Sequence, residues 1–430
     1  MKKRAGRSVG KQVVGHVMPA ALQQLALPMM LASEAIKQGL LAFVQQVGLL
    51  AFRELLEAEA AAVAGPKGKH AKDRTHNHWG TTHTPLPFGG RQVVVERPRV
   101  RRRGKGGLEE ELPSIALARD ADPMPEQVAE QIVAGVSTRG YRRTLEPVAE
   151  SLETKGESKS QVSRVLVERT ADKLEEFTTR KLDDVTLTAM LIDGIEIAKH
   201  AVIIALGVTH DGTKVPLGLW CGSTENHVVA AELLQNLIGR GLRVTSPLLF
   251  VIDGGKGIRK ALNDVFGDRA VVQRCQVHKA RNVREHLPEE RRAYVRQQMR
   301  AAYQSKSVKT AKMTLGQLAS WLESNGEDAA AASLREGLDE TLTVLRLGLP
   351  PTLIRTFGTT NAIENMNGTL RRVIRNVKRW RGESMIQRWV ALGIVEAERG
   401  FRRVKGHRQM ALLVAALLPK TGLADAKSAA

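Results

Sequence analysis

The spacing of hydrophobic residues changes along the chain, and each change predicts a different kind of element. From 19 to 64, and again from 124 to 178, apolar side chains recur at helical spacing, which is typical of amphipathic helices. Between these stretches, residues 65–118 are rich in Gly, Pro and basic side chains and contain a strand-like run at 91–97. From Val185 onward, short apolar runs alternate with helical stretches, which is typical of an α/β fold.

Five apolar runs after Val185 predict the strands of this α/β region. The predicted strands cover residues 186–193, 200–209, 214–221, 247–253 and 270–277. Helical stretches flank the fourth run, whereas residues 210–213, between the second and third, have the composition of a hairpin turn. The resulting order β-β-β-α-β-α-β, with an acid ending the first and the fourth strand, suits an RNase H-like core.

A helix-turn-helix is one interpretation of residues 124–178. A break at Gly135 is followed by a capping-box pattern at 158–161, which opens another helix. The second helix of such a motif reads the DNA major groove from its N-terminal end. Pro147 interrupts the middle of the region, so a plain helical bundle remains an alternative. The candidate DNA-binding side chains here are Arg139, Arg142, Arg143, Ser158, Lys159, Gln161 and Arg164.

The charge balance indicates a class of partner. The 430 residues include 65 Lys and Arg against 45 Asp and Glu, a formal net charge of +20. This excess points to a polyanion, most simply nucleic acid, although a ribosome-associated or merely basic surface is the alternative. Two cysteines, Cys221 and Cys275, are too few for a disulfide framework and fit a reducing cytosol. No uninterrupted apolar run reaches the length of a membrane span, so we expect no membrane partner.

Three acidic residues occupy positions suited to a metal site. Asp193 and Asp253 end two of the predicted strands, and Glu364 opens a basic helix. Mg²⁺ prefers oxygen ligands, and two divalent cations roughly 3.5–4 Å apart can activate a nucleophile and stabilise a leaving oxygen in phosphodiester cleavage. Each acid also has a structural alternative. The two Asp-Gly pairs could be turns, and Glu364 could form a capping box with Asn361.

Five short segments carry a family resemblance. They are IDG at Asp193, GSTENHVVAAELLQNLIGRGL at 222–242, VIDGGKG at Asp253, QRCQVHKARNV at 273–283 and TTNAIENMNGTLRR at 359–372. In this order they resemble the Mutator-type DDE transposases encoded by bacterial insertion sequences, and the resemblance covers most of residues 75–405. It implies catalysis by Asp193, Asp253 and Glu364 as ligands of two Mg²⁺ or Mn²⁺ ions. It also implies an RNase H-like core that carries an all-helical insertion domain.

The family's C-x-x-H pattern falls on Cys275 and His278. We expect Cys275 to pack beneath the sheet, while His278, Arg281 and Asn282 face DNA or the active site. Zinc binding is an alternative, but zinc would need two further ligands. The nominal candidates for these ligands are His286 and Cys221.

Two arginines of the last of these segments are candidate phosphate contacts. Arg371 and Arg372 follow Glu364 by about two helical turns. A solvated basic helix face would have the same composition, so this assignment remains an expectation.

Together these observations predict a DNA transposase that cuts at transposon ends and transfers the strands into target DNA. Its substrate would be double-stranded DNA with terminal inverted repeats, and joining two ends requires at least a homodimer. The resemblance also implies the bacterial cytoplasm, in association with the nucleoid. Alternatives are a non-catalytic DNA-binding protein derived from a transposase and an RNase H-like nuclease that cuts without joining.

The same observations predict how the chain is divided. The predicted parts are an N-terminal helical region at 1–64, a basic linker with short strands at 65–118, a helix-turn-helix-like DNA-binding region at 119–180, an RNase H-like catalytic core at 181–278 and 359–380, a helical insertion domain at 279–358 and a basic helical C-terminal region at 381–430.

Overall fold

The computed structural model describes residues 39–69, 73–104, 106–149, 152–222, 224 and 226–418. The chain divides into two compact units: an N-terminal unit of Met1–Gln131 and Val136–Leu166, and a C-terminal unit of Ile132–Gly135 and Val167–Ala430. The part of the expected helical region before residue 39 lies outside the described residues. Among the helices that the structure describes, none is long and apolar enough to cross a membrane.

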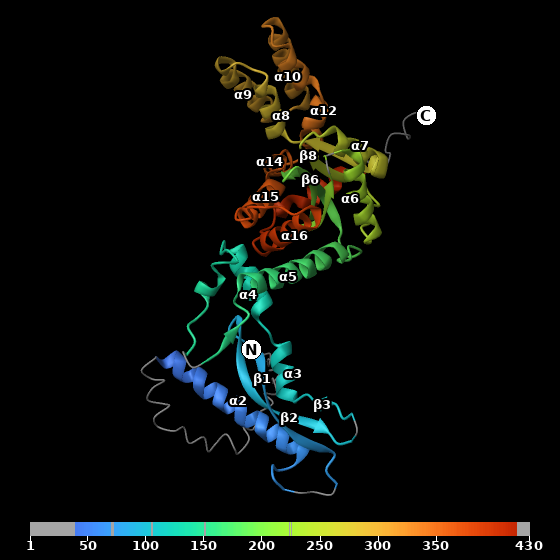
Figure 1. The fold of residues 1–430 in the computed structure, drawn as a ribbon. Helices are drawn as coiled ribbons and strands as arrows, with labels where there is room; N and C mark the ends of the chain where they lie inside the picture. The colour runs from blue at the N-terminus through green and yellow to red at the C-terminus, as the bar shows by residue number, and fades with distance from the viewer. Residues whose placement is uncertain are drawn as a thin grey trace, which may run out of the picture. The chain divides into compact units, whose positions relative to one another are not determined.

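A long β-hairpin with helices packed on it forms the core of the N-terminal unit (Figure 1). Its elements are α2 (Leu40–Ala64), β1 (His76–Phe88), β2 (Arg91–Arg102), β3 (Glu109–Glu110), α3 (Pro113–Asp120) and β4 (Thr154–Lys155). β1, β3 and β4 all pair with β2 in antiparallel fashion. Leu56 and Ala60 of α2 and Ile115 of α3 share a buried cluster with Val93 and Val95 of β2.

The hairpin differs from the short strands in a basic linker that the sequence predicted. Val93 and Val95 are buried and alternate with the half-buried Gln92, Val94 and Glu96, because successive strand residues point to opposite faces. The basic residues that follow are paired: Arg97 and Arg99 reach Glu109 at 2.9 and 2.7 Å. The strand is therefore longer than the predicted run at 91–97, and two of its arginines share the carboxylate of Glu109.

The segment interpreted as a helix-turn-helix contains two helices with a long connection. α4 (Met124–Val133) and α5 (Lys159–Thr179) are separated by residues 134–158, whereas that motif has a turn of about three or four residues. Part of the connection is a single turn of 3₁₀ helix, η2 (Tyr141–Thr144). The buried Tyr141 donates its hydroxyl to the Gly90 carbonyl at 2.7 Å, which fixes this stretch to the hairpin. Ser158 does cap α5, since its Oγ accepts from the Gln161 N–H at 3.3 Å.

A five-stranded mixed sheet lies at the centre of the C-terminal unit and confirms the predicted α/β class. Its strands are β5 (Leu187–Ile197), β6 (His200–Thr209), β7 (Lys214–Gly222), β8 (Leu248–Ile252) and β9 (Ala270–Arg274). They lie in the order β7-β6-β5-β8-β9; the first three are antiparallel, and β8 and β9 continue the sheet in parallel with β5. β5 extends beyond its predicted end at Asp193, because Ile195 and Ile197 continue its buried alternation.

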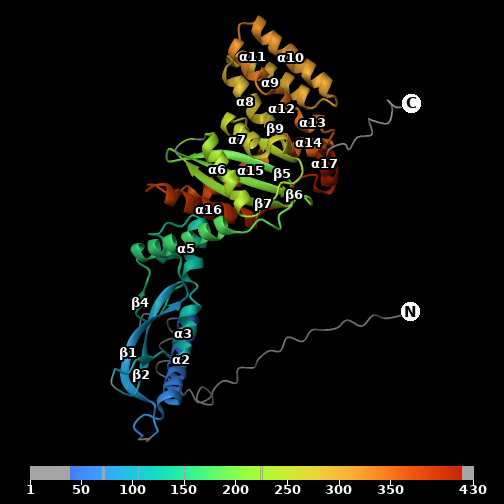
Figure 2. The ribbon, with the colours of Figure 1, turned by 90° about the vertical axis from the view of Figure 1, so that its right-hand side faces the viewer.

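Helices cover both faces of this sheet (Figure 2). The covering helices are α6 (His227–Gly239), α7 (Lys256–Phe266), α15 (Asn361–Ile374), α16 (Glu383–Arg399) and α17 (Met410–Leu417). α6 and α7 share one buried cluster with Ile192 and Ile252, whereas α15, α16 and α17 share the other with Leu191 and Val251. Adjacent residues of β5 and β8 therefore belong to opposite layers.

The chain between β9 and α15 is mainly helical, as its sequence predicts. Its helices are α8 (Gln276–Glu285), α9 (Glu289–Tyr303), α10 (Val308–Ser324), α11 (Asp328–Arg335), α12 (Leu338–Thr341), α13 (Thr343–Arg346) and α14 (Pro351–Phe357). α8 to α11 enclose a separate hydrophobic core. The buried Gln273 of β9 joins this part to the sheet: its Nε2 donates to the Thr341 carbonyl at 2.8 Å, and its Oε1 accepts from the Val344 N–H at 2.9 Å.

Candidate active site

The first two candidate carboxylates lie on neighbouring strands. Ile192 of β5 pairs in parallel register with Ile252 of β8. Asp193 directly follows Ile192 in the sequence, and Asp253 directly follows Ile252. Asp193 is 7% exposed. It lies within β5, where Gly194 still pairs with Ile203 of β6, so the turn suggested for Asp193-Gly194 is not formed.

Asp253, in contrast, does begin a turn. Its Oδ1 accepts from the Gly255 N–H at 2.9 Å, and Gly254 has a φ of +111°, which glycine adopts without strain. The turn points the chain toward α7 and leaves the Asp253 carboxylate where the parallel pairing with β5 has stopped. Asp253 can therefore form the turn suggested for Asp253-Gly254 and still be a candidate metal ligand.

Glu364 lies in the first turn of α15. Its Oε1 accepts from the Thr360 hydroxyl at 2.7 Å, and Thr360 itself is the N-cap residue. The expected capping box would instead bond Glu364 to the backbone of Asn361. The hydroxyl of Thr360 thus fixes one carboxylate oxygen of Glu364 and leaves the other without a described protein partner.

Asn367 connects α15 to the acids, and the sequence analysis missed it. It lies three residues after Glu364, on the same side of the helix. This side chain is 1% exposed, and its Nδ2 donates to Asp193 Oδ2 at 2.8 Å. Asn367 Oδ1 has no hydrogen-bond partner among the described residues. The spacing E-x-x-N within a helix that opens with a candidate ligand is the signal that could have identified it.

Electrostatics shows that the acids act on one another. Burial raises the pKa of Asp193 to about 6, and the charges of Asp253 and Glu364 add to this shift. The charge of His278 and the hydrogen bond from Asn367 oppose it. The structure therefore brings Asp193, Asp253 and Glu364 close enough together for mutual repulsion.

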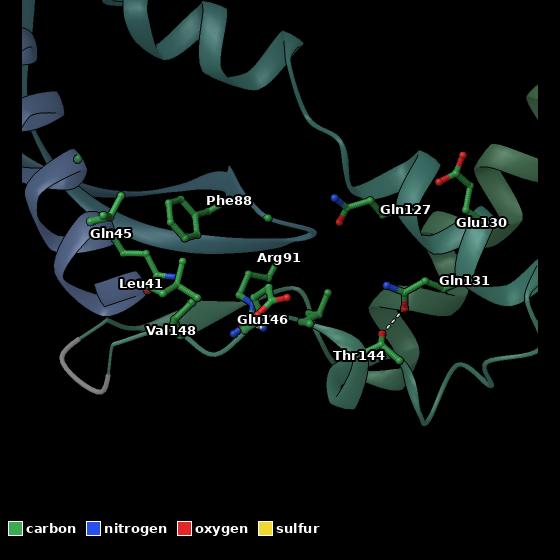
Figure 3. Close-up of a pocket in the computed structure, with 14 residues that line it drawn as sticks. Leu41, Gln45, Phe88, Arg91, Gln127, Glu130, Gln131, Thr144, Glu146 and Val148 are labelled. Carbon is green, nitrogen blue, oxygen red and sulfur yellow. Dashed lines mark hydrogen bonds between the residues drawn. The ribbon is translucent and has the colours of Figure 1, made fainter. Parts of the chain in front are cut away.

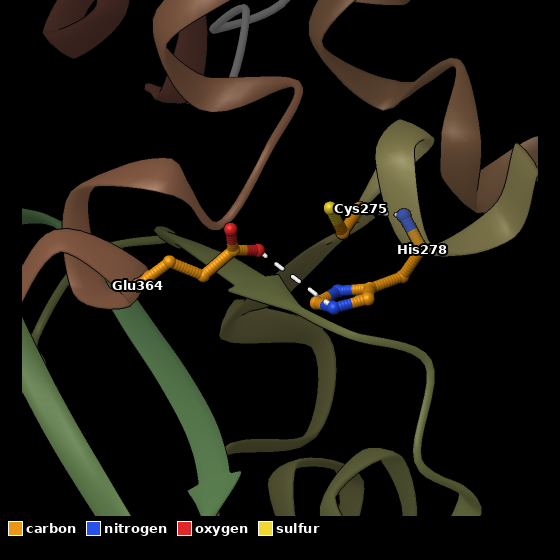
Figure 4. A group of neighbouring side chains, drawn as sticks. All are labelled: Cys275, His278 and Glu364. Carbon is orange, nitrogen blue, oxygen red and sulfur yellow. Dashed lines mark hydrogen bonds and ion pairs between the residues drawn. The ribbon is translucent and has the colours of Figure 1, made fainter. Parts of the chain in front are cut away.

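Cys275 and His278 lie beside Glu364 (Figure 4). Cys275 is fully buried at the N-cap of α8, and its Sγ lies 3.5 Å from the His278 backbone nitrogen and 3.3 Å from Thr360 Oγ1. His278 Nε2 lies 3.7 Å from Glu364 Oε1. Burial raises the pKa of Cys275, but hydrogen bonds from His278 and Thr360 outweigh it and leave the pKa lowered. The same contact with Cys275, followed by the charges of Glu364 and Asp193, raises the pKa of His278 against the effect of burial.

One group of three could hold a metal ion by itself. Ligand atoms of Cys275, His278 and Glu364 lie within 4.8 Å of one another. The two nominal zinc ligands do not join them. Cys221 is buried in β7, and His286 is the C-cap residue of α8, about 15 Å from the helix start.

Most of the predicted DNA-contacting residues are solvent-exposed. In the C-terminal unit these are Arg281, Asn282, Arg371 and Arg372. The last two lie at the end of α15, about 10–12 Å along the helix from Glu364. In the N-terminal unit Arg139, Arg143, Ser158, Lys159 and Arg164 are exposed, and Gln161 is half-buried. Arg142 is exposed but pairs with Glu157 at 3.0 Å.

A cavity of about 660 Å³ lies in the N-terminal unit, between α2, the hairpin turn and α4 (Figure 3). Gln45, Phe88 and Gln127 are among the residues that line it. None of the predicted site residues belongs to its described lining, so its size does not connect it to the carboxylates.

The sequence of this chain is similar to those of known proteins. The model of the family described as "Transposase, Mutator family" matches residues 22–403. The chain belongs to the Mutator family of transposases. This confirms the resemblance predicted from the sequence, and the matched range contains all three carboxylates of this Mutator-family chain.

Three relatives of this Mutator-family chain are named as transposases. It is 28% identical over 357 residues to the transposase for insertion sequence element ISRM5 of Rhizobium meliloti, which covers 79% of this chain and 85% of the relative. The transposase for insertion sequence element IS905 of Lactococcus lactis is 24% identical over 352 residues, again 79% and 85%. The transposase for insertion sequence element ISRM3 of Rhizobium meliloti is 29% identical over 207 residues, which is 48% of this chain and 50% of the relative.

Proposed function

We propose that this chain is a DDE transposase, which cuts DNA at transposon ends and transfers the freed strands into target DNA. The observation that carries the proposal is the convergence of Asp193, Asp253 and Glu364 from two strands and a helix. Membership in the Mutator family supports the same function. The DNA-contacting roles of the basic residues, the homodimer and the action on inverted repeats belong to this proposal.

The sheet topology supports an RNase H-like core. Three antiparallel strands followed by two parallel ones, in the order β7-β6-β5-β8-β9, form a mixed sheet with helices on both faces. Under this proposal α8 to α14 form the helical insertion between the second and third acids, and their separate hydrophobic core is consistent with a distinct domain.

The donor set fits divalent cations. Burial raises the pKa of Asp193, and repulsion by the charges of Asp253 and Glu364 adds to the shift, so a cation would be favourable here. Oxygen donors are the ligands that Mg²⁺ and Mn²⁺ prefer, and the unpartnered Asn367 Oδ1 adds another oxygen beside Asp193. We infer that Asp193, Asp253 and Glu364 hold two such ions, which would supply an activated nucleophile and stabilise the leaving oxygen.

The protein's own groups then have separate tasks. Asn367 fixes one oxygen of Asp193, so that the other oxygen can serve as a ligand. Thr360 does the same for Glu364 through its hydroxyl. His278 lies next to Glu364, and its hydrogen bond with Cys275 and the charges of Glu364 and Asp193 raise its pKa, which favours the protonated imidazole.

We expect the purified chain to cut and join DNA only when a divalent cation is present. The substrate is a linear fragment that ends in the inverted repeats flanking the gene, incubated with a supercoiled target plasmid. Chelation should abolish both products, and Mg²⁺ or Mn²⁺ should restore them. Cutting without joined products would favour a nuclease, and binding without cutting would favour a non-catalytic DNA-binding protein.

Replacing Asn367 should weaken the cation site without unfolding the protein. In Asn367→Ala, Asp193 loses the donor that orients it, and loss of such an orienting group costs about 10–100-fold in metal affinity or activity. The half-saturating Mg²⁺ concentration for cleavage should therefore rise, with thermal unfolding in chelator as the folding check. The exposed Asn325→Ala is the matched control. An unchanged Mg²⁺ dependence would remove Asn367 from the site.

A further inference from the structure

A cavity of about 590 Å³ lies beside the start of α15 and is lined by basic side chains. The basic residues of its lining are Lys214, Arg355, Arg402, Arg403 and Lys405. No acidic residue is among the described residues that line it. Asn361 and Asn365 of α15, which flank Glu364 in the helix, form part of the same wall. The cavity therefore adjoins the helix that presents Glu364.

A second cavity, of about 340 Å³, is lined by residues of α8, α9 and α14. Its basic residues are Arg284, Arg296, Arg300 and Arg355, and again no described lining residue is acidic. Met299, Tyr303 and Ile354 contribute a less polar part of the lining. Arg355 and Thr359 line both cavities, so the two are neighbours. Val277, which precedes His278, also lines the second cavity.

Most of these cations lack a carboxylate partner. Arg403 pairs with Asp211 at 2.9 Å, but within the described part of the chain Arg355, Arg402 and Lys405 form no ion pair. The same holds for the exposed Arg296 and Arg300 on α9. Some other arginines of this unit do have such a partner, as in the pair between Arg335 and Glu323 at 2.9 Å. An uncompensated cluster repels itself, and an anion would relieve the repulsion.

Backbone contacts hold the walls of the two cavities together. The Gln276 N–H at the start of α8 donates to the Gly358 carbonyl at 2.9 Å. The Thr356 hydroxyl of α14 donates to the Lys405 carbonyl at 2.9 Å. The arginines and lysines therefore project from connected main-chain segments.

We propose that the two cavities form one groove that binds the phosphate backbone of a DNA strand beside the carboxylates. The groove is defined by Lys214, Arg284, Arg296, Arg300, Arg355 and the segment 402–405. Contacts from Lys and Arg to phosphate oxygens position DNA without reading its sequence, and they suit a strand that enters or leaves the reactive centre. The identity of the polyanion rests on the proposed function, whereas the anion-binding groove rests on the cavities and their charges.

The salt dependence of DNA binding tests the groove. The full chain is titrated in chelator, so that no cutting occurs, with a labelled duplex of unrelated sequence and a single strand of the same length. Three variants remove groove charges: Arg355→Gln, the double variant Arg402→Gln with Lys405→Gln, and the double variant Arg296→Gln with Arg300→Gln. The plot of log K against log salt has a negative slope. Each lost phosphate contact should reduce the magnitude of this slope by about 1, so a double variant should reduce it by about 2.

Two controls separate groove contacts from general charge and from misfolding. The double variant Arg243→Gln with Lys260→Gln removes two exposed charges, one of them on α7, which covers the opposite face of the sheet from α15, and should leave the slope unchanged. Arg355→Lys keeps the charge and should keep the slope. Unchanged slopes in both groove double variants, with normal thermal unfolding, would overturn the groove.

The result is independent of catalysis. If the chain cuts DNA with Mg²⁺ but the groove variants show no change of slope, the proposed groove is wrong and the proposed function stands. If the groove variants show a smaller salt dependence but the chain never cuts DNA, the groove stands and the proposed transposase chemistry is wrong.

Discussion

Glu364→Gln should reduce metal-dependent DNA cleavage by roughly 10³-fold or more, as expected for loss of a group that acts directly in catalysis. The substitution preserves shape, and the amide oxygen can still accept from the Thr360 hydroxyl. It removes the negative charge that a divalent cation requires of the site. DNA binding in chelator should remain largely intact, because the groove residues and the exposed basic residues are unchanged.

The control for this substitution is Glu383→Gln. Glu383 is also in the first turn of a helix, α16, and accepts from the Gln387 amide at 2.9 Å, but it is exposed. Cleavage is measured by appearance of nicked and linear product over a range of Mg²⁺ concentrations. Cleavage by Glu364→Gln at the rate of the unmodified chain would remove Glu364 from the triad and with it the DDE mechanism.

The carboxylates could be predicted because they lie on strongly patterned elements. The runs before Asp193 and Asp253 are apolar enough to identify buried strands, and the helix that Glu364 opens has clear periodicity. The register could not be predicted. That Ile192 lies opposite Ile252 depends on pairing between segments separated by β6, β7 and α6. Asn367 was missed for the same reason, since its partner is Asp193 on another element.

The N-terminal unit shows where local pattern misleads. The run at 91–97 was predicted as a short strand within a basic linker, but it belongs to the longer β2, whose Val93 and Val95 lie in a buried cluster. In the region of helical spacing at 124–178, the connection between α4 and α5 is instead fixed to the hairpin by the hydrogen bond from the buried Tyr141 hydroxyl to the Gly90 carbonyl. Both are tertiary effects, and neither leaves a signal in a short window of sequence.

The groove could not be predicted from the sequence, because its residues come together only in the folded chain. Its cations come from β7, α8, α9, α14 and the segment after α16, which are distant in sequence. Each of them taken alone reads as part of a solvated basic face. The informative feature is that these cations, most of them without a carboxylate partner in the described part of the chain, line two neighbouring cavities with no acidic residue in their described lining.

Asp193→Asn should make the metal-free protein more stable at pH 7 while it abolishes cleavage. Burial and two neighbouring acids raise the pKa of Asp193 from 3.8 to about 6. At pH 7 the folded protein therefore holds an ionised carboxylate in an unfavourable place, at a cost of about 2–3 kcal/mol. The neutral amide avoids this cost and can still accept the hydrogen bond from Asn367.

The pH dependence of this difference identifies its cause. Between about pH 4 and 6 the folded protein binds the proton on Asp193 more readily than the unfolded chain does, so its stability rises as the pH falls through this window. The advantage of Asp193→Asn should therefore be largest above pH 6 and nearly vanish at pH 4, in chemical denaturation with chelator. The exposed Asp184→Asn should show no such trend.

Adding Mg²⁺ at pH 7 should stabilise the unmodified protein, because the ion binds its folded state, and should stabilise Asp193→Asn far less. Equal stabilisation of both proteins by Mg²⁺ would mean that Asp193 is not a ligand. If Asp193→Asn is still more stable than the unmodified protein at pH 4, the ionised carboxylate of Asp193 is not the cause of the difference in stability.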